Sequence, residues 1–147
     1  MISLTSLFEI SPEHVVTPDP NINGKFLVHF HQARKAGDHW DIRLGHDGAL
    51  VSWATKKLPE LIDEDVKKIM LFKQPDHNPD WFDFRGEITD GYGAGNVNIY
   101  DKGKYDILKW EKNIITVDLK GTKMKGIYTF LFYGENQWLL FKSSRIK

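Results

Sequence analysis

The residues with the clearest chemical potential lie in one short segment, His39-Trp40-Asp41-Ile42-Arg43. Side chains alternate between the two faces of a β-strand, so His39, Asp41 and Arg43 would share one face, where water can reach them. Imidazole nitrogen and carboxylate oxygen bind divalent metals such as Mn²⁺, Fe²⁺ and Zn²⁺, and a guanidinium binds phosphate through paired N–H donors. The pattern predicts metal-dependent phosphoester chemistry. A polar strand face with an ordinary Asp–Arg ion pair is the alternative interpretation.

Four further residues are candidates for the same site. His31 lies eight residues before His39 on a preceding apolar stretch, and it could complete the metal site from a neighbouring strand. His77, in a Pro-flanked segment, could bind a phosphate oxygen or move a proton near neutral pH. Lys57 could also bind phosphate. Trp81, close to His77 in sequence, is the aromatic residue best placed to contact a substrate.

Composition limits the class of protein. The 147 residues are enough for one domain, and the absence of cysteine excludes disulfides, thiolate metal sites and a cysteine nucleophile. The net charge of zero argues against a protein that coats duplex DNA. Residues 101–147 nevertheless carry 10 Lys/Arg against 5 Asp/Glu, which suits either a phosphate backbone or a solvated lysine face. No apolar run could cross a membrane and no secretory signal begins the chain, so we expect a cytoplasmic protein.

The elements that must position these residues are short strands separated by turn signals, among them a hairpin turn at Asp47-Gly48 and a turn at Lys102-Gly103. Residues 1–24 contain three prolines and an Asn-Gly turn signal, and we expect an irregular lead-in before a domain at 25–147. One short helix is expected over Glu60–Lys68, followed later by a loop over Gln74–Asp80. The predicted fold class is all-β, as a sandwich or barrel. The expected strands are Phe26–His31, His39–Leu44, Ala49–Thr55, Ile69–Phe72, Phe84–Ile88, Asn96–Asp101, Lys104–Trp110, Ile114–Leu119, Ile127–Tyr133 and Gln137–Lys142.

The order of motifs from about Phe26 to Lys142 resembles the 3′-phosphoesterase domain of bacterial ligase D and its stand-alone relatives. The segments that carry the resemblance are Phe26–His31, His39–Leu44, Asp47–Ala54, Asp76-His77, Phe84–Ile88, Tyr92–Gly95 and Trp138–Lys142.

The resemblance implies a compact single-domain β-barrel of about eight short strands with one or two short helices, and a groove that holds one Mn²⁺-type ion, with Zn²⁺ or Co²⁺ as other options. It implies removal of a 3′-terminal ribonucleoside and then a 3′-phosphate from DNA ends, leaving a 3′-OH. By position, His31, His39 and Asp41 match the metal ligands of the family. Arg43 and His77 match its phosphate-contacting residues, and Lys57 a further basic residue.

The chain departs from the family pattern at several positions. His31 and His39 are farther apart than usual, so the loop Gln32–Asp38 is longer. Trp81 replaces a tyrosine, which keeps a donor but loses a hydroxyl. Pro75 stands where a carboxylate is common. We therefore expect the metal site to carry over more fully than the choice between phosphodiester and phosphomonoester.

The expected function is a monomeric DNA 3′-end-processing phosphoesterase for repair. Its partners would be DNA or DNA/RNA 3′ ends, together with a ligase or polymerase. Arg43, His77 and Lys57 would stabilise charge on phosphate, and His77 would protonate the leaving group. One alternative is a facial-triad iron(II) oxygenase, with His77 as its third ligand and Arg43 or Lys57 holding an acid cosubstrate. A non-catalytic module that binds nucleic-acid 3′ ends is the other.

Overall fold

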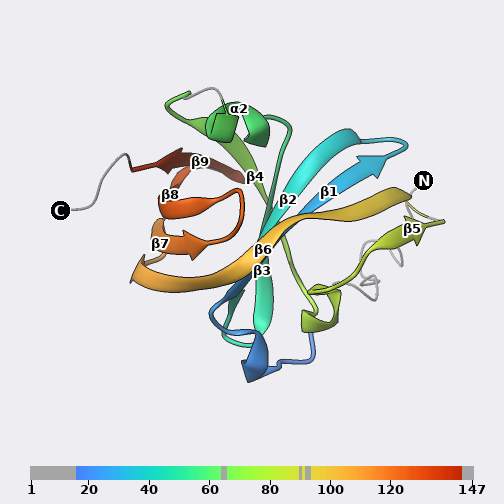
Figure 1. Cartoon of the computed structure of the whole chain (residues 1–147), viewed down its shortest axis with the longest axis horizontal. Helices are drawn as coiled ribbons and strands as arrows, with labels where there is room; N and C mark the ends of the chain where they lie inside the picture. The colour runs from blue at the N-terminus through green and yellow to red at the C-terminus, as the bar shows by residue number, and fades with distance from the viewer. Residues whose placement is uncertain (1–15, 64–65, 90, 92–93, 144–147) are drawn as a thin grey trace.

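The computed structural model describes residues 16–63, 66–89, 91 and 94–143. Over these residues nine strands form one antiparallel sheet in the order β1-β2-β3-β4-β9-β8-β7-β6-β5, and pairing of β1 with β6 closes it into a barrel (Figure 1). The predicted barrel is confirmed. The elements are η2 (Pro20–Ile22), β1 (Lys25–Ala33), β2 (Gly37–His46), β3 (Ala49–Thr55), α2 (Leu58–Asp63), β4 (Ile69–His77), η3 (Pro79–Trp81), β5 (Gly86–Ile88), β6 (Gly95–Trp110), β7 (Ile114–Lys120), β8 (Lys125–Gly134) and β9 (Gln137–Lys142).

Alternation along the strands divides the barrel into two faces. Inward-facing residues such as Val28, Ile42 and Trp53 are fully buried in one apolar core. Each side chain on the inside is followed by one that points outward. On β1, β2 and β3 the outward face carries the polar side chains of the candidate site, beside apolar residues such as Leu27 and Leu50.

The region around residue 102 differs from the prediction. A turn was expected at Lys102-Gly103, but β6 runs without a break for 16 residues. The Asp101 carboxylate accepts hydrogen bonds from the backbone N–H groups of Lys102, Thr122, Lys123 and Met124, at 2.8–3.0 Å. Gly103 lies so close to the Lys120 carbonyl that no Cβ would fit. The glycine therefore permits close packing against the β7–β8 connection, where a turn had been inferred.

Three other boundaries also differ. The helix is shorter and earlier than predicted, at Leu58–Asp63. Strand β4 continues to His77 because it pairs with β3 through Ser52↔Gln74 and Leu50↔His77, so residues 74–77 are not a loop. The strand expected over Phe84–Ile88 begins at Gly86. Of the lead-in, residues 16–24 contain η2, and residues 1–15 lie outside the described part.

No helix within the described residues is long and apolar enough to cross a bilayer.

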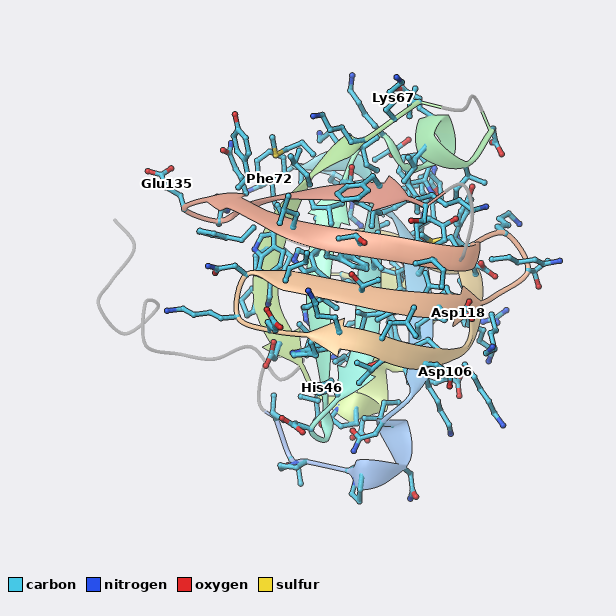
Figure 2. All side chains as sticks on the ribbon, turned by 90° about the vertical axis from the view of Figure 1, so that its left-hand side faces the viewer. His46, Lys67, Phe72, Asp106, Asp118 and Glu135 are labelled. Atoms are coloured by element: carbon cyan, nitrogen blue, oxygen red, sulfur yellow. The ribbon has the colours of Figure 1, made fainter. Side chains whose placement is uncertain are left out.

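Asp101→Ala is expected to destabilise the fold by about 2–4 kcal/mol, because four backbone donors lose a charged acceptor in a site where Asp101 is only 5% exposed. Equilibrium urea denaturation measures the change. Asp106→Ala is the control, since Asp106 lies on the outside of the barrel in an exposed ion pair with Lys120 (Figure 2). That substitution should cost less than about 1 kcal/mol. Equal losses in the two variants would contradict the role of Asp101.

Candidate metal and phosphate site

Strand pairing brings the predicted residues together on the outer face of the barrel. In the β1–β2 ladder His31 lies opposite His39, and His29 lies opposite Asp41. In the β2–β3 ladder Arg43 lies opposite Ser52. Because alternate residues share a face, all of these side chains project to the same side, away from the apolar core.

Two imidazoles and one carboxylate converge at the centre of this face. One potential ligand atom from each of His31, His39 and Asp41 lies within 4.8 Å of the other two. The His39 Nε2 to Asp41 Oδ2 distance is 3.3 Å, and the His31 Nδ1 to Asp41 Oδ2 distance is 3.7 Å. Two nitrogens and one oxygen at this spacing fit a divalent transition metal and leave coordination positions for water or substrate.

The ring of His39 is oriented by the backbone. Its Nδ1 lies 3.0 Å from the carbonyl oxygen of Gly37 and donates a hydrogen bond to it in the neutral ring. In that tautomer Nε2 is the nitrogen that can offer its lone pair to a metal, and in the protonated ring Nε2 donates to Asp41, whose Oδ2 lies 3.3 Å away. An imidazole whose second nitrogen is held by a carbonyl is the usual arrangement for a metal ligand.

The charge of Asp41 is stabilised despite burial. Burial alone would raise its pKa, but hydrogen bonds from His31 and His39 and the charge of Arg43 outweigh this effect and hold the pKa well below its usual range. Burial lowers the pKa of His39, and the hydrogen bond to Asp41 together with its charge outweighs that and raises it. The lowered pKa favours the anionic form of Asp41, which is the state that a metal requires.

His29 is a site residue that the sequence interpretation did not select. It is fully buried, and its Nδ1 accepts a hydrogen bond of 3.0 Å from Nε of Arg43. Its Nε2 donates to the carbonyl oxygen of Phe84 at 2.8 Å. Burial, followed by the charge of Arg43, lowers the pKa of His29 to about 4. His29 is thus a neutral ring that orients Arg43, and strand alternation, which placed it on the face of His31, was the signal available for it.

Arg43 is held at three points. Besides His29, its Nη1 donates to Oγ of Ser52 at 3.0 Å, and its Nη2 lies 3.5 Å from Oδ2 of Asp41. Its side chain is only 5% exposed. The guanidinium is therefore fixed beside the metal-ligand cluster.

The chain between β4 and β5 covers part of the site. The ring of Trp81 meets His29 and His77 edge to face, with ring centroids 6.4 and 6.1 Å apart, and packs on Phe84 at 4.3 Å. His77 Nδ1 donates to the carbonyl of Pro75 at 2.9 Å, and the residue is 8% exposed. The structure therefore places Trp81 between His77 and His29, and the roles predicted for His77 and Trp81 stay predictions.

Two expectations need qualification. Water was expected to reach the whole polar face, but Asp41 and Arg43 are each 5% exposed, because the covering segment and the neighbouring side chains enclose them. Lys57 is exposed beyond the end of β3, and among the described residues no recorded contact links its side chain to the cluster. Lys56 is the lysine tied to this region, since its Nζ donates to the Ala36 carbonyl at 2.7 Å, beside the turn that precedes His39. The role of Lys57 stays a prediction.

The neutral His29 makes stability depend on pH in a defined direction. The unfolded chain binds a proton at His29 near pH 6.5, whereas the folded chain does so only near pH 4. The contribution of neutral His29 to the free energy of unfolding is therefore complete above pH 6.5 and is lost as the pH falls toward 4. The loss is on the order of 2–3 kcal/mol. His29→Gln keeps an acceptor for Arg43 and a donor for Phe84 but does not titrate. We expect its free energy of unfolding, measured by urea denaturation in chelator from pH 7.5 to 4.5, to fall less than that of the wild type. An equal loss of unfolding free energy in the wild type and in His29→Gln over this pH range would contradict the role of His29.

The sequence of this chain matches a known protein family and several known proteins. Residues 29–131 match the family model described as the DNA Ligase D 3′-phosphoesterase domain. The multifunctional non-homologous end joining DNA repair protein LigD of Mycobacterium tuberculosis strain H37Rv is 35% identical over 136 residues, covering 88% of this chain and 17% of that protein. The LigD proteins of Pseudomonas aeruginosa and Mycolicibacterium smegmatis are 36% and 34% identical over 129 and 135 residues, covering 81% and 83% of this chain and 15% and 17% of theirs.

The chain thus spans well under a quarter of the length of these relatives, and the match falls on the strands that carry the site. The family match begins at His29 and includes every residue placed at the site above. The chain belongs to the DNA ligase D 3′-phosphoesterase domain family.

Proposed function

We propose that this protein is a Mn²⁺-dependent phosphoesterase that processes DNA 3′ ends for repair, removing a terminal ribonucleoside, a 3′-phosphate, or both, to leave a 3′-OH. The observation that carries the proposal is the cluster of His31, His39 and Asp41 with the Arg43 guanidinium fixed beside it. Membership of the ligase D 3′-phosphoesterase family supports the same reaction. The LigD relatives are named for non-homologous end joining, which supports DNA ends as the substrate.

The metal would be held by His31, His39 and Asp41, and Zn²⁺ or Co²⁺ could replace Mn²⁺ in such a set. When bound there, it supplies Lewis acidity to a phosphate oxygen and lowers the pKa of a coordinated water. Arg43 would bind a non-bridging oxygen with N–H donors that are already oriented, so little reorganisation is needed as negative charge grows. Lys57, on the exposed loop after β3, would add a cation to the approaching DNA backbone.

His77 would donate a proton to the leaving oxygen. Its Nδ1 is directed to the Pro75 carbonyl, so Nε2 is the nitrogen that can exchange a proton with substrate. The Trp81 ring against His77 would restrict where the terminal nucleotide sits, and its indole N–H could donate to phosphate.

The two alternatives differ in what they require of the site. The oxygenase hypothesis assigns His77 as a metal ligand. The side chains that converge within the described residues are instead those of His31, His39 and Asp41. That set also suits iron(II), but a guanidinium fixed beside it favours a phosphate ligand. A binding module without catalysis would retain 3′-phosphate ends and release no product.

Turnover tests the proposal directly. A 5′-labelled primer–template with a 3′-phosphate or a single 3′-ribonucleotide should be converted to a 3′-OH end only with divalent metal. Asp41→Ala and His39→Ala should each lower the rate by at least about 1000-fold, because each removes a metal ligand. Asp47→Ala, in the exposed β2–β3 turn, is the control and should keep the wild-type rate. Near-wild-type rates in either ligand variant would refute the assignment, and binding without product from folded wild-type protein would favour the binding module.

Metal binding can be measured without substrate. Isothermal titration of the chelator-treated protein with Mn²⁺ should give one site, and saturating Mn²⁺ should raise the melting temperature, because an ion that binds only the folded chain stabilises it. Asp41→Ala should abolish the heat of binding and Asp47→Ala should preserve it. Unchanged binding in Asp41→Ala would place the metal elsewhere.

A further inference from the structure

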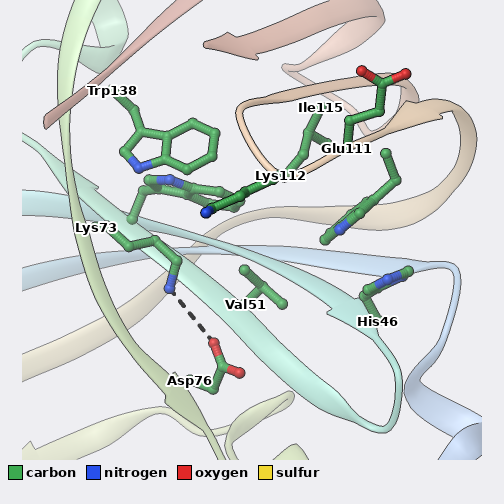
Figure 3. Close-up of a pocket in the computed structure, with 10 residues that line it drawn as sticks. His46, Val51, Lys73, Asp76, Glu111, Lys112, Ile115 and Trp138 are labelled. Carbon is green, nitrogen blue, oxygen red and sulfur yellow. Dashed lines mark hydrogen bonds and ion pairs between the residues drawn. The ribbon is translucent and has the colours of Figure 1, made fainter. Parts of the chain in front are cut away.

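A cavity lies at one mouth of the barrel, on the inner side of the strands that carry the site. Its volume is about 340 Å³, within the range of about 300–1,000 Å³ that is typical of pockets for small organic ligands. Strands β3, β4 and β9 and the β6–β7 hairpin line it, together with His46 at the end of β2 (Figure 3). None of the residues assigned to the metal or phosphate site lines this cavity.

The cavity opens where β4 leaves β9. Pairing between these strands ends at Phe72↔Gln137, beside the β8–β9 turn that carries Glu135 (Figure 2). One more hydrogen bond joins the N–H of Lys73 to the carbonyl of Asn136. Beyond it β4 pairs only with β3 within the described residues, and Asp76 in this part of β4 lines the cavity.

Aromatic rings form much of the wall. Trp110 stacks on His46 with ring centroids 3.7 Å apart and an angle of 18° between the rings. Trp138 meets Phe132 edge to face at 5.7 Å, and Phe132 is 37% exposed at the end of β8. Trp110 is half-buried and Trp138 is 8% exposed, so a flat ring entering the mouth would contact mainly the indole of Trp110, as nucleobases contact aromatic rings in proteins that bind single strands.

Two lysines complete the wall. The ammonium of Lys73 lies 5.5 Å from the ring centroid of Trp53 and 3.5 Å from a carboxylate oxygen of Asp76. In Figure 3 the side chains of Lys73 and Lys112 both extend into the pocket, whereas the carboxylate of Glu111 points away. Within the described residues no carboxylate forms an ion pair with Lys112. A ligand with a flat ring and a negative charge fits this combination, and a nucleotide has both.

The pocket also backs directly onto the candidate active site. Val51 lines the pocket and Ser52, the next residue of β3, contacts Arg43. Asp76 lines the pocket and His77, the next residue of β4, lies in the site. Neighbouring residues on a strand face opposite sides, so the two openings are separated by one layer of strand. A short stretch of unpaired DNA crossing residues 74–76 would reach from one to the other.

We propose that the pocket at the barrel mouth binds one unpaired nucleotide of the DNA end whose 3′ terminus lies at the metal site. The base stacks on the wall formed by Trp110 and Trp138, and its phosphate pairs with Lys112. The inference rests on the proposed function for its substrate and adds a preference for DNA ends with a single-stranded tail. A fully paired end cannot place a base in the pocket.

Fluorescence anisotropy with two metal-free DNAs tests the proposal, one a blunt duplex and the other the same duplex with a short unpaired 3′ tail. The wild type should bind the tailed DNA about tenfold more tightly, the effect of one stacked base and one paired phosphate. Lys112→Glu should remove most of this advantage and leave affinity for the blunt duplex nearly unchanged. Lys125→Glu makes the same charge change at the opposite end of β7 from Lys112, where β8 begins, and should keep the preference for the tailed DNA.

A 5-iodouracil placed along the tail should cross-link to Trp110 or Trp138. Peptide mass spectrometry identifies the cross-linked residue.

The outcomes separate this proposal from the proposed function. The nucleotide pocket is overturned if the preference for tailed over blunt DNA is equal in the wild type, Lys112→Glu and Lys125→Glu. It is also overturned if the cross-links are confined to other peptides. Either result would count even if 3′-phosphate removal proceeds normally. Loss of the advantage in Lys112→Glu alone would support the pocket even if no variant releases phosphate, and the phosphoesterase proposal would then be the one that fails. Circular dichroism of each variant establishes that it is folded.

Discussion

The buried carboxylate of Asp41 is the constraint around which the site is organised. An anion removed from water is stable only with close positive or donating partners, and here His31, His39 and Arg43 provide them. His39 and Arg43 lie on β2 with Asp41, whereas His31 comes from β1, so a shift of one residue in the register between β1 and β2 would turn His31 to the wrong face. The requirements of charge burial and of barrel packing therefore select the same register.

The arginine depends on a second arrangement, which reaches outside the barrel. Neutral His29 accepts from Nε of Arg43 and donates to the carbonyl of Phe84, so it links the guanidinium to the segment that covers the site. The same segment carries Trp81, whose ring lies against both His29 and His77. Trp81 thus contacts both His77 and the ring that orients Arg43.

Strands β3 and β4 each place functional side chains on both faces of the barrel wall. Ser52 and His77 point to the site on the outside, whereas Val51, Trp53 and Asp76 line the cavity at the barrel mouth. This division follows from the two-residue period of a strand, and it needs no second domain. In a sheet one layer thick, residues adjacent in sequence can take part in chemistry on one side and in ligand binding on the other.

Much of the fold and the centre of the site followed from local pattern. Alternation in His39–Leu44 and Phe26–His31 determined which side chains share a face, and Asp47-Gly48 determined the hairpin that joins β2 to β3. Tertiary structure decided what local pattern could not. Lys102-Gly103 continues a strand because Asp101 and Gly103 pack against the β7–β8 connection, and His77 is a strand residue because β3 pairs with it. The burial of Asp41 and Arg43, and the partnership of His29 with Phe84, a residue 55 positions away, depend on contacts between distant segments. A sequence determines the periodicity of each strand, whereas the neighbours that bury and orient its side chains exist only once the barrel has closed.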